Sequence, residues 1–344
     1  MADKSDIVLQ ALKGVLYFQK GSDIVTLNTV RNLKVDGNKI SFSIAFQKQD
    51  NKSQPVLQKL CAAAIRNNVD EKAEVIIDFI TEYPSLSGVK HIVAVGSGKG
   101  GVGKSTIAAN LAIALHKTGK SVGLLDADIY GPSIPIMFGV EDQKPTMADT
   151  NDGPKIIPIE KYGIKIQSIG FFVDPAQALI WRGPMASNAL NQLFNDTHWG
   201  ELDYLIVDLP PGTGDIHLTL VQQYPIEGIA IVSTPQQVAL ADARKAFSMF
   251  NQEKIRIPIL GLIENMSYFT PAELPDNKYY IFGKQGGRKL ADEARMNLLG
   301  EIPIVQSICE SGDSGKPIAL DESSPVYKAF INLAMNISAM VEKN

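Results

Sequence analysis

Apolar and polar residues are spaced in two different ways along this chain, and the spacing changes near residue 90. In the first part, short alternating runs separated by turn residues such as Asp36-Gly37 predict strands, and apolar residues three and four apart predict a helix. The predicted elements are a short helix over Asp6 to Gly14, strands over Thr26 to Arg31, Lys39 to Phe46 and Lys72 to Ile80, and an amphipathic helix around Leu57 to Ile65. Together they predict a small α/β module.

From His91 onward, longer apolar runs alternate with helical stretches. Such runs suit strands covered on both faces, which is typical of a parallel, doubly wound sheet. The predicted strands are Ile92 to Val95, Ser121 to Leu125, Tyr204 to Val207, Gly228 to Val232 and Ile259 to Ile263. Lys104 to Lys117 predicts a helix. Between Gly131 and Gly200 we expect an irregular insertion that carries Trp181 and one helix, from Pro184 to Phe194. The expected fold class is α/β with a mostly parallel sheet.

Residues that break regular structure cluster between Tyr83 and Gly88. Clusters of Pro, Ser and Gly between periodic segments are typical of linkers. We therefore predict a small α/β domain over residues 1–82, a linker over 83–90 and a second domain over 91–344.

A glycine-rich loop follows the first apolar run of the second domain and precedes its first helix. The loop residues are Gly98, Lys99, Gly100, Gly101, Val102, Gly103, Lys104, Ser105 and Thr106. In this P-loop spacing, glycines let successive N–H groups turn toward a phosphate, and the helix N-terminus adds its dipole. The pattern predicts ATP binding, with Lys104 on the β- and γ-phosphates and the Ser105 hydroxyl on Mg²⁺. A flexible glycine-rich turn is the alternative.

Two predicted strands end in aspartates. Asp126 and Asp128 follow Leu124-Leu125, and Asp208 follows Val207 and precedes Pro210-Pro211-Gly212. In parallel sheets, ligands bind at the carboxyl ends of the strands, so we expect these carboxylates beside the phosphate loop. For Asp126, a helix cap or a loop-stabilising contact is the alternative.

The charge balance is mild, with 33 basic against 37 acidic residues and a net charge of -4. It lacks the basic excess typical of nucleic-acid-binding surfaces, so we expect no nucleic-acid partner. The two cysteines, Cys61 and Cys309, cannot form a disulfide framework, and the N-terminus lacks the layout of a signal peptide. We therefore expect a cytoplasmic protein.

Phosphate binding within one subunit does not require a second lysine in the loop, yet Lys99 is present. With it, Gly98 to Thr106 resembles the deviant Walker A motif of MinD, ParA, nitrogenase iron protein and Mrp-type ATPases. In that class the extra lysine reaches across a nucleotide-sandwich homodimer to the partner's phosphates, where it would act as an arginine finger does. The resemblance implies the same for Lys99, and an exposed lysine without this role is the alternative.

The same resemblance implies roles for other residues. Asp128 would orient or deprotonate the attacking water with support from Asp126, Asp208 would hold Mg²⁺, and the Gly212 N–H would sense the γ-phosphate. The guanine-reading Asn-Lys-x-Asp is absent, and Glu264-Asn265-Met266 and Ile302-Pro303 resemble adenine-side segments. Asn265 and Pro303 are therefore expected at the base, and an Asx-turn is the alternative for Asn265.

Longer strings narrow the resemblance to the Mrp/ApbC-type iron–sulfur cluster carriers. They are Asp126 to Pro135, Trp181 to Met185, Asp208 to Asp215, Glu264 to Ser267 and Ser314 to Pro317. The N-terminal module is similar to the small domain that precedes the ATPase in many Mrp proteins. The resemblance implies a homodimeric ATPase that binds iron–sulfur clusters or transfers them to apoprotein clients.

The chain departs from this family in its cysteines. The family usually carries Cys-x-x-Cys after Glu-Asn-Met-Ser, giving four thiolates per dimer for one cluster, but Met266 to Pro275 contains no cysteine. Cys61, on the apolar side of a predicted helix, is interpreted as a core thiol. Cys309, in a predicted polar loop, is the candidate cluster ligand or reactive thiol, and a cysteine without chemistry is the alternative.

Two other functions stay open. One is a MinD/ParA-like positioning ATPase, and the other is an ATP-gated adaptor that delivers a partner's cluster and docks through the N-terminal module. The stretch Val326 to Val341 has apolar residues at helical spacing, as a membrane-binding helix would. Such helices need a basic face, and only Lys328 and Lys343 lie nearby, so packing onto the sheet is expected instead of stable membrane association.

Overall fold

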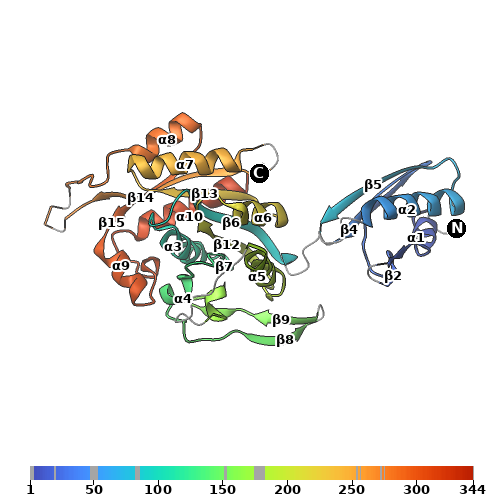
Figure 1. The fold of residues 1–344 in the computed structure, drawn as a ribbon, viewed down its shortest axis with the longest axis horizontal. Helices are drawn as coiled ribbons and strands as arrows, with labels where there is room; N and C mark the ends of the chain where they lie inside the picture. The colour runs from blue at the N-terminus through green and yellow to red at the C-terminus, as the bar shows by residue number, and fades with distance from the viewer. Residues whose placement is uncertain are drawn as a thin grey trace. The chain divides into compact units, whose positions relative to one another are not determined.

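The structure is a computed structural model that describes residues 4–18, 21–46, 53–81, 86–150, 153–173, 183–252, 255, 257–271, 273–274 and 276–343. The chain divides into two compact units, Met1–Tyr83 and Pro84–Asn344 (Figure 1). Each unit has its own cluster of buried apolar side chains. In the described part of the chain, no helix is long and apolar enough to cross a membrane.

The first unit packs two helices on a three-stranded sheet. Its elements are α1 (Lys4–Leu12), β1 (Leu16–Tyr17), β2 (Ser22–Asp23), β3 (Val30–Asp36), β4 (Lys39–Phe46), α2 (Gln54–Asn68) and β5 (Glu74–Thr81). Strand β4 lies in the middle, antiparallel to β3 and parallel to β5. The predicted helices and the last two predicted strands are therefore present.

The strand predicted over Thr26 to Arg31 begins four residues later than expected, so the prediction was wrong for its first part. The Asp23 carboxylate accepts hydrogen bonds from the N–H groups of Val25 and Thr26, at 3.0 and 2.8 Å. Aspartate commonly forms such local turns with the backbone that follows it. The turn occupies the residues that the alternating pattern had assigned to a strand.

The second unit is a P-loop type α/β domain built on one large sheet. Its elements are β6 (Val89–Ser97), α3 (Lys104–Lys117), β7 (Val122–Asp126), α4 (Ile134–Met137), β8 (Thr146–Thr150), β9 (Gly153–Ile157), β10 (Ile159–Lys161), β11 (Ile164–Ser168), η4 (Ile169–Phe171), α5 (Gly183–Asn195), β12 (Leu202–Pro211), α6 (Asp215–Gln223), β13 (Gly228–Ser233), α7 (Gln237–Phe250), β14 (Ile259–Phe269), α8 (Gly286–Ala294), β15 (Leu298–Ile304), α9 (Gln306–Asp313), η5 (Ile318–Leu320) and α10 (Tyr327–Val341).

The sheet has eight strands in the order β10-β11-β7-β12-β6-β13-β14-β15. Only β10 runs antiparallel to its neighbour, and the other pairings are parallel. Every residue of β7 and of β13 is buried. Figure 1 shows helices on both sides, with α7 and α8 on one and α3 on the other, so the predicted doubly wound fold is confirmed.

The region between Gly131 and Gly200 is more regular than expected, and the prediction of an irregular insertion was wrong. It contains the hairpin of β8 and β9, and it contributes β11 to the main sheet beside β7. The hydrophobic pattern did not predict β11 because this strand contains polar residues. One of them, Gln167, is buried and is tolerated there because its side chain donates a hydrogen bond to Thr197 Oγ1 at 2.9 Å. Helix α5 matches the predicted helix, whereas Trp181 lies outside the described residues.

The C-terminal helix α10 packs on the body of the domain, as predicted. Its buried side chains are Phe330, Leu333, Ala334, Ile337 and Val341. They belong to the main apolar cluster, and α10 contacts both α3 and β15. The apolar face of this helix is therefore used in the core.

Candidate nucleotide site

The phosphate loop joins the central strand β6 to the N-terminus of α3. Gly101 and Gly103 have φ values of 80° and 81°, in the left-handed region that glycine tolerates. A Cβ at Gly98 would lie 2.2 Å from the carbonyl carbon and oxygen of Asp242, and one at Gly103 would lie 2.2 Å from Asn265 Nδ2. Close packing thus requires glycine at position 98, backbone conformation favours it at position 101, and both constraints act at Gly103.

Lys104 is the first residue of α3, and its side chain is buried among oxygen atoms. Its Nζ lies 2.7 Å from Asp208 Oδ1 and 3.6 Å from Asp128 Oδ2. It also donates a hydrogen bond to Ser105 Oγ at 3.1 Å. The lysine, the serine and the two strand-end carboxylates predicted from the sequence therefore meet at one point.

Strand register explains why the carboxylates meet. Asp208 of β12 is paired with Asp126 of β7 on one side and with Val95 of β6 on the other. Because all three strands are parallel, their carboxyl ends reach the same edge of the sheet, where the loop after β6 lies. Asp128 follows two residues after β7 and remains buried at this edge.

Two carboxylate oxygens at this edge are buried without a hydrogen-bond partner among the described residues, Asp128 Oδ1 and Asp208 Oδ2. Burial raises the pKa of Asp208, although the Lys104 ammonium acts in the opposite direction. Unpaired buried oxygens are costly, and hard divalent cations such as Mg²⁺ prefer oxygen ligands. The unpaired Asp208 oxygen and the Ser105 hydroxyl therefore fit a magnesium ion, and the unpaired oxygen of Asp128 lies at the same edge of the sheet.

Asp126 is used to hold the loop that follows β7. Its Oδ1 accepts from the Asp128 N–H at 3.1 Å, and its Oδ2 accepts from the Ile134 N–H at 3.2 Å and from Ser168 Oγ at 3.0 Å. Burial, and then the charge of Asp208, raise the pKa of Asp126 to about 8. These contacts match the loop-stabilising alternative for Asp126.

The remaining predicted residues surround this centre. Gly212, with φ 96°, donates its N–H to Ser97 O at 2.9 Å. Asn265 Nδ2 donates to Val102 O at 2.8 Å, so its amide holds the phosphate loop. Pro303 directly follows Ile302, the residue paired with Asn265 across β14 and β15. Lys99 is half-buried, and among the described residues no side chain pairs with its ammonium.

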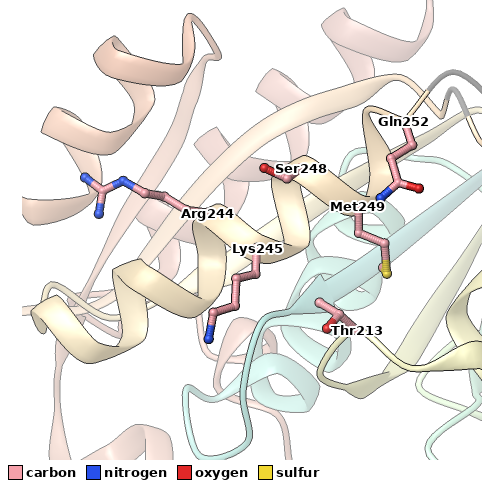
Figure 2. Close-up of a pocket in the computed structure, with 6 residues that line it drawn as sticks. All are labelled: Thr213, Arg244, Lys245, Ser248, Met249 and Gln252. Carbon is pink, nitrogen blue, oxygen red and sulfur yellow. The ribbon is translucent and has the colours of Figure 1, made fainter.

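A groove of about 450 Å³ lies between α7 and the loop after β12 (Figure 2). It is lined by Thr213, Arg244, Lys245, Ser248, Met249 and Gln252. In Figure 2, Met249 points toward Thr213 and Arg244 points away from it. The groove contains none of the predicted site residues.

Comparison with known proteins identifies the family. A family model described as NUBPL iron-transfer P-loop NTPase matches residues 88–338, and another described as iron-sulfur cluster assembly protein matches residues 5–79. The chain belongs to the iron-transfer P-loop NTPase family. The predicted resemblance is confirmed, and the chain is a P-loop NTPase by family and by the geometry of its loop.

Individual relatives of this P-loop NTPase agree. The chain is 41% identical over 346 residues to an iron-sulfur cluster carrier protein of Synechocystis sp., and the matched region covers 98% of each chain. It is 51% identical over 260 residues to one of Aquifex aeolicus, covering 75% of this chain and 70% of the other. A nucleotide-binding protein of Archaeoglobus fulgidus, solved with ADP, shares 37% identity with a TM-score of 0.61 over 72% of this chain and 94% of that chain.

The two cysteines of this P-loop NTPase lie in different environments. Cys61 is fully buried in the core of the first unit, and burial raises its pKa to about 12. Cys309 is exposed on α9, so the prediction of a polar loop there was wrong: Gln306 to Asp313 forms a short helix that contacts α4 and η5. The carboxylates of Asp313 and Glu310 raise the pKa of Cys309. Neither thiol is activated.

The described residues contain no group of three or more His, Cys, Asp or Glu that could hold a metal ion by side-chain clustering. Four thiolates are the usual ligand set of an iron–sulfur cluster. Two copies of the chain would present only two exposed thiols, one Cys309 each. The cysteines of this chain therefore do not fit a cluster bound in the manner that the family usually uses.

Two polar residues near the site, His217 and Glu264, received no role of their own from the sequence. His217 of α6 is buried, and its Nε2 lies 2.6 Å from the carbonyl oxygen of Pro210, so Nε2 must carry the proton. Burial lowers the pKa of His217, which keeps the ring neutral. Glu264 is also buried, next to Asn265 in β14. A charged residue directly after the apolar run Ile259 to Ile263 was the signal that could have identified it.

Proposed function

We propose that this chain is a magnesium-dependent ATPase that works as a cytoplasmic homodimer in the transfer of iron–sulfur clusters to apoproteins. The observation that carries the proposal is the convergence of Lys104 on Asp208 and Asp128 at the start of α3, with one oxygen of each carboxylate unpaired. Membership of the iron-transfer P-loop NTPase family and the names of its relatives support the choice of cargo.

In this proposal the loop amides and the N-terminus of α3 bind the β- and γ-phosphates. Lys104 turns from the carboxylates to the phosphates, because a phosphate carries more negative charge than either carboxylate. Ser105 and Asp208 hold Mg²⁺, whose charge offsets that of the phosphates when it is bound. Asp128 Oδ1 accepts a hydrogen bond from the attacking water, orients it and takes up its proton. The Gly212 N–H leaves Ser97 O and donates its hydrogen bond to the γ-phosphate instead.

Lys99 supplies the argument for a dimer. Lys99 is half-buried as a residue, yet its ammonium pairs with no side chain of its own subunit among the described residues. A second copy of the chain facing this loop would present phosphates to Lys99, and each subunit would complete the other's site. We assign the base side to Asn265 and Pro303, which lie on adjacent strands at the same edge of the sheet.

The decisive experiment measures ATP hydrolysis with and without Mg²⁺ for the wild-type chain and for Asp128→Asn. We expect turnover that requires Mg²⁺, and a loss of about 10²-fold or more in kcat for the variant, because the amide cannot accept a proton. Asp142→Asn, an exposed change in the same unit, is the matched control and should leave kcat unchanged. Undiminished turnover in Asp128→Asn would contradict the assignment.

The positions of the cysteines favour a second candidate, an ATP-gated adaptor that holds no cluster of its own. Cys61 is enclosed in a core, and Cys309 is exposed on a helix beside carboxylates. Anaerobic cluster reconstitution followed by iron and sulfide analysis separates the two candidates. Stoichiometric cluster in the wild type that is lost in Cys309→Ala supports a carrier. Absence of cluster in both, with ATPase activity intact, supports the adaptor.

A further inference from the structure

The C-terminal half of β14 joins the phosphate loop to a distant part of the domain through three hydrogen bonds. Asn265 Nδ2 donates to Val102 O, inside the phosphate loop. The neighbouring Glu264 accepts the Ser267 hydroxyl on Oε1 at 2.5 Å and the Gly287 N–H on Oε2. Glu264, Asn265 and Ser267 are all at least nine-tenths buried, so water does not compete for these bonds.

The backbone between these contacts is held in an unusual conformation. Met266 has φ 55°, in the left-handed region that is unfavourable for a side chain with a Cβ. The pairing of β14 with β15 also shifts register between Asn265 and Phe269. A conformation of this kind persists only where the surroundings hold it, and the bonds of Asn265 on one side and Ser267 on the other do so.

Beyond Ser267, the chain forms a loop that returns to Glu264. Phe269 and Tyr279 exchange backbone hydrogen bonds of 2.8 Å in both directions, which closes the loop at its base. The chain then reaches Gly287 in the first turn of α8, where a Cβ would lie 2.7 Å from Glu264 Oε2. Both the start and the end of the segment 267–287 are therefore fixed on one carboxylate, with its charge at the N-terminus of a helix, where it is favourable.

We infer that Glu264 is a positioning residue that couples nucleotide binding at the phosphate loop to the conformation of the segment 267–287. Val102 belongs to the loop that turns around the phosphates. When the Val102 carbonyl moves, its hydrogen bond with Asn265 transmits the displacement to β14. Because Glu264 ties both ends of the segment to this point, the segment and α8 follow the movement. The inference rests on the proposed nucleotide binding. It predicts that the segment 267–287 forms a surface whose conformation changes when nucleotide binds.

The test is amide hydrogen exchange of the full-length chain with and without a non-hydrolysable ATP analogue and Mg²⁺. In the wild type we expect slower exchange in residues 98–106 and a change of about fivefold or more in residues 267–271 and 276–287, the lower end of usual coupling between sites. In Glu264→Ala, exchange in 98–106 should still respond, whereas the change in the segment should fall below about twofold.

Two milder variants separate coupling from general loss of structure. Glu264→Gln keeps an oxygen that can accept the Gly287 N–H, so it should restore most of the response of the segment. Ser267→Ala removes only the bond from the hydroxyl and should give an intermediate response. If Glu264→Ala does not fold, the test rests on the other three proteins. The nucleotide-dependent change in exchange of the segment should then decrease from the wild type to Glu264→Gln to Ser267→Ala.

The outcomes distinguish this inference from the proposed function. No response of residues 98–106 in the wild type would remove the nucleotide site itself. A response of 98–106 together with an unchanged response of the segment in Glu264→Ala, or in both milder variants, would overturn the role of Glu264 and leave the ATPase standing. A purely structural role predicts lower thermal stability in the variants with the nucleotide response of the segment intact.

Discussion

The phosphate site and the helix that carries Cys309 belong to the same unit but differ in how their polar groups are held. At the phosphate site, Lys104 and three aspartates are buried and contact one another or backbone groups at 2.7 to 3.6 Å. Cys309 is exposed, and its nearest partner is Asp313 at 3.7 Å on the same helix. The first arrangement is organised for nucleotide chemistry, whereas the second offers no organised ligand set for a metal cluster.

The largest effect that would sharpen this contrast is expected for Lys99→Ala. If Lys99 neutralises phosphate charge across a dimer, kcat for ATP should fall by about 10³-fold or more. Nucleotide affinity, measured by calorimetry, should change far less, since Lys104 and the loop amides remain. Lys117→Ala, in a surface ion pair with Glu322, is the matched control. Turnover close to that of the wild type in Lys99→Ala would refute the dimeric site.

A second prediction concerns the buried Asp126, whose pKa is raised to about 8. Between the unfolded pKa near 4 and this value, the folded chain binds a proton that the unfolded chain has released, so stability should fall as pH rises through this window. The contribution is at most about 1.4 kcal/mol per pH unit. Unfolding of the nucleotide-free chain from pH 5 to 8 should show a shallower fall for Asp126→Asn, and an identical slope would contradict the assignment.

The smallest effects are expected for serine substitutions at the two cysteines. Cys61→Ser places a hydroxyl in an apolar core and should destabilise the first unit by about 1 to 3 kcal/mol. Cys309→Ser, on an exposed surface, should change stability by less than about 0.5 kcal/mol and leave ATP turnover unaltered. Amide exchange of α2 and of α9 reports each change locally. A loss of turnover in Cys309→Ser would show that this helix takes part in the nucleotide cycle.

Much of the nucleotide site could be predicted from the sequence because its signals are local. The spacing of Gly98, Gly103 and Lys104 defines a loop at a helix N-terminus, and α3 begins and ends at the residues predicted. Aspartates that follow apolar strands reach the same edge of any parallel sheet, so Asp128 and Asp208 could be placed without knowing the strand order. The residue types and their distance from a strand end were sufficient.

Other features depend on partners far away in the chain. Strand β11 was missed because the burial of Gln167 is tolerated only beside Thr197, thirty residues later. The contact of Asn265 with Val102 and that of Glu264 with Gly287 also join segments that no local pattern connects. Cys309 was placed in a loop, since a helix of eight residues with polar neighbours has little periodicity to read.

The sequence by itself determined the fold class, the phosphate loop, the strand-end carboxylates and the absence of paired cysteines after Ser267, because each is a matter of residue type and short spacing. Only the tertiary structure decided that Asp126 holds its loop, that Asn265 holds the phosphate loop, and that Glu264 ties both ends of the segment 267–287. The physical reason is that a buried polar group is defined by the partner that satisfies it, and these partners are brought together only by the packing of the sheet.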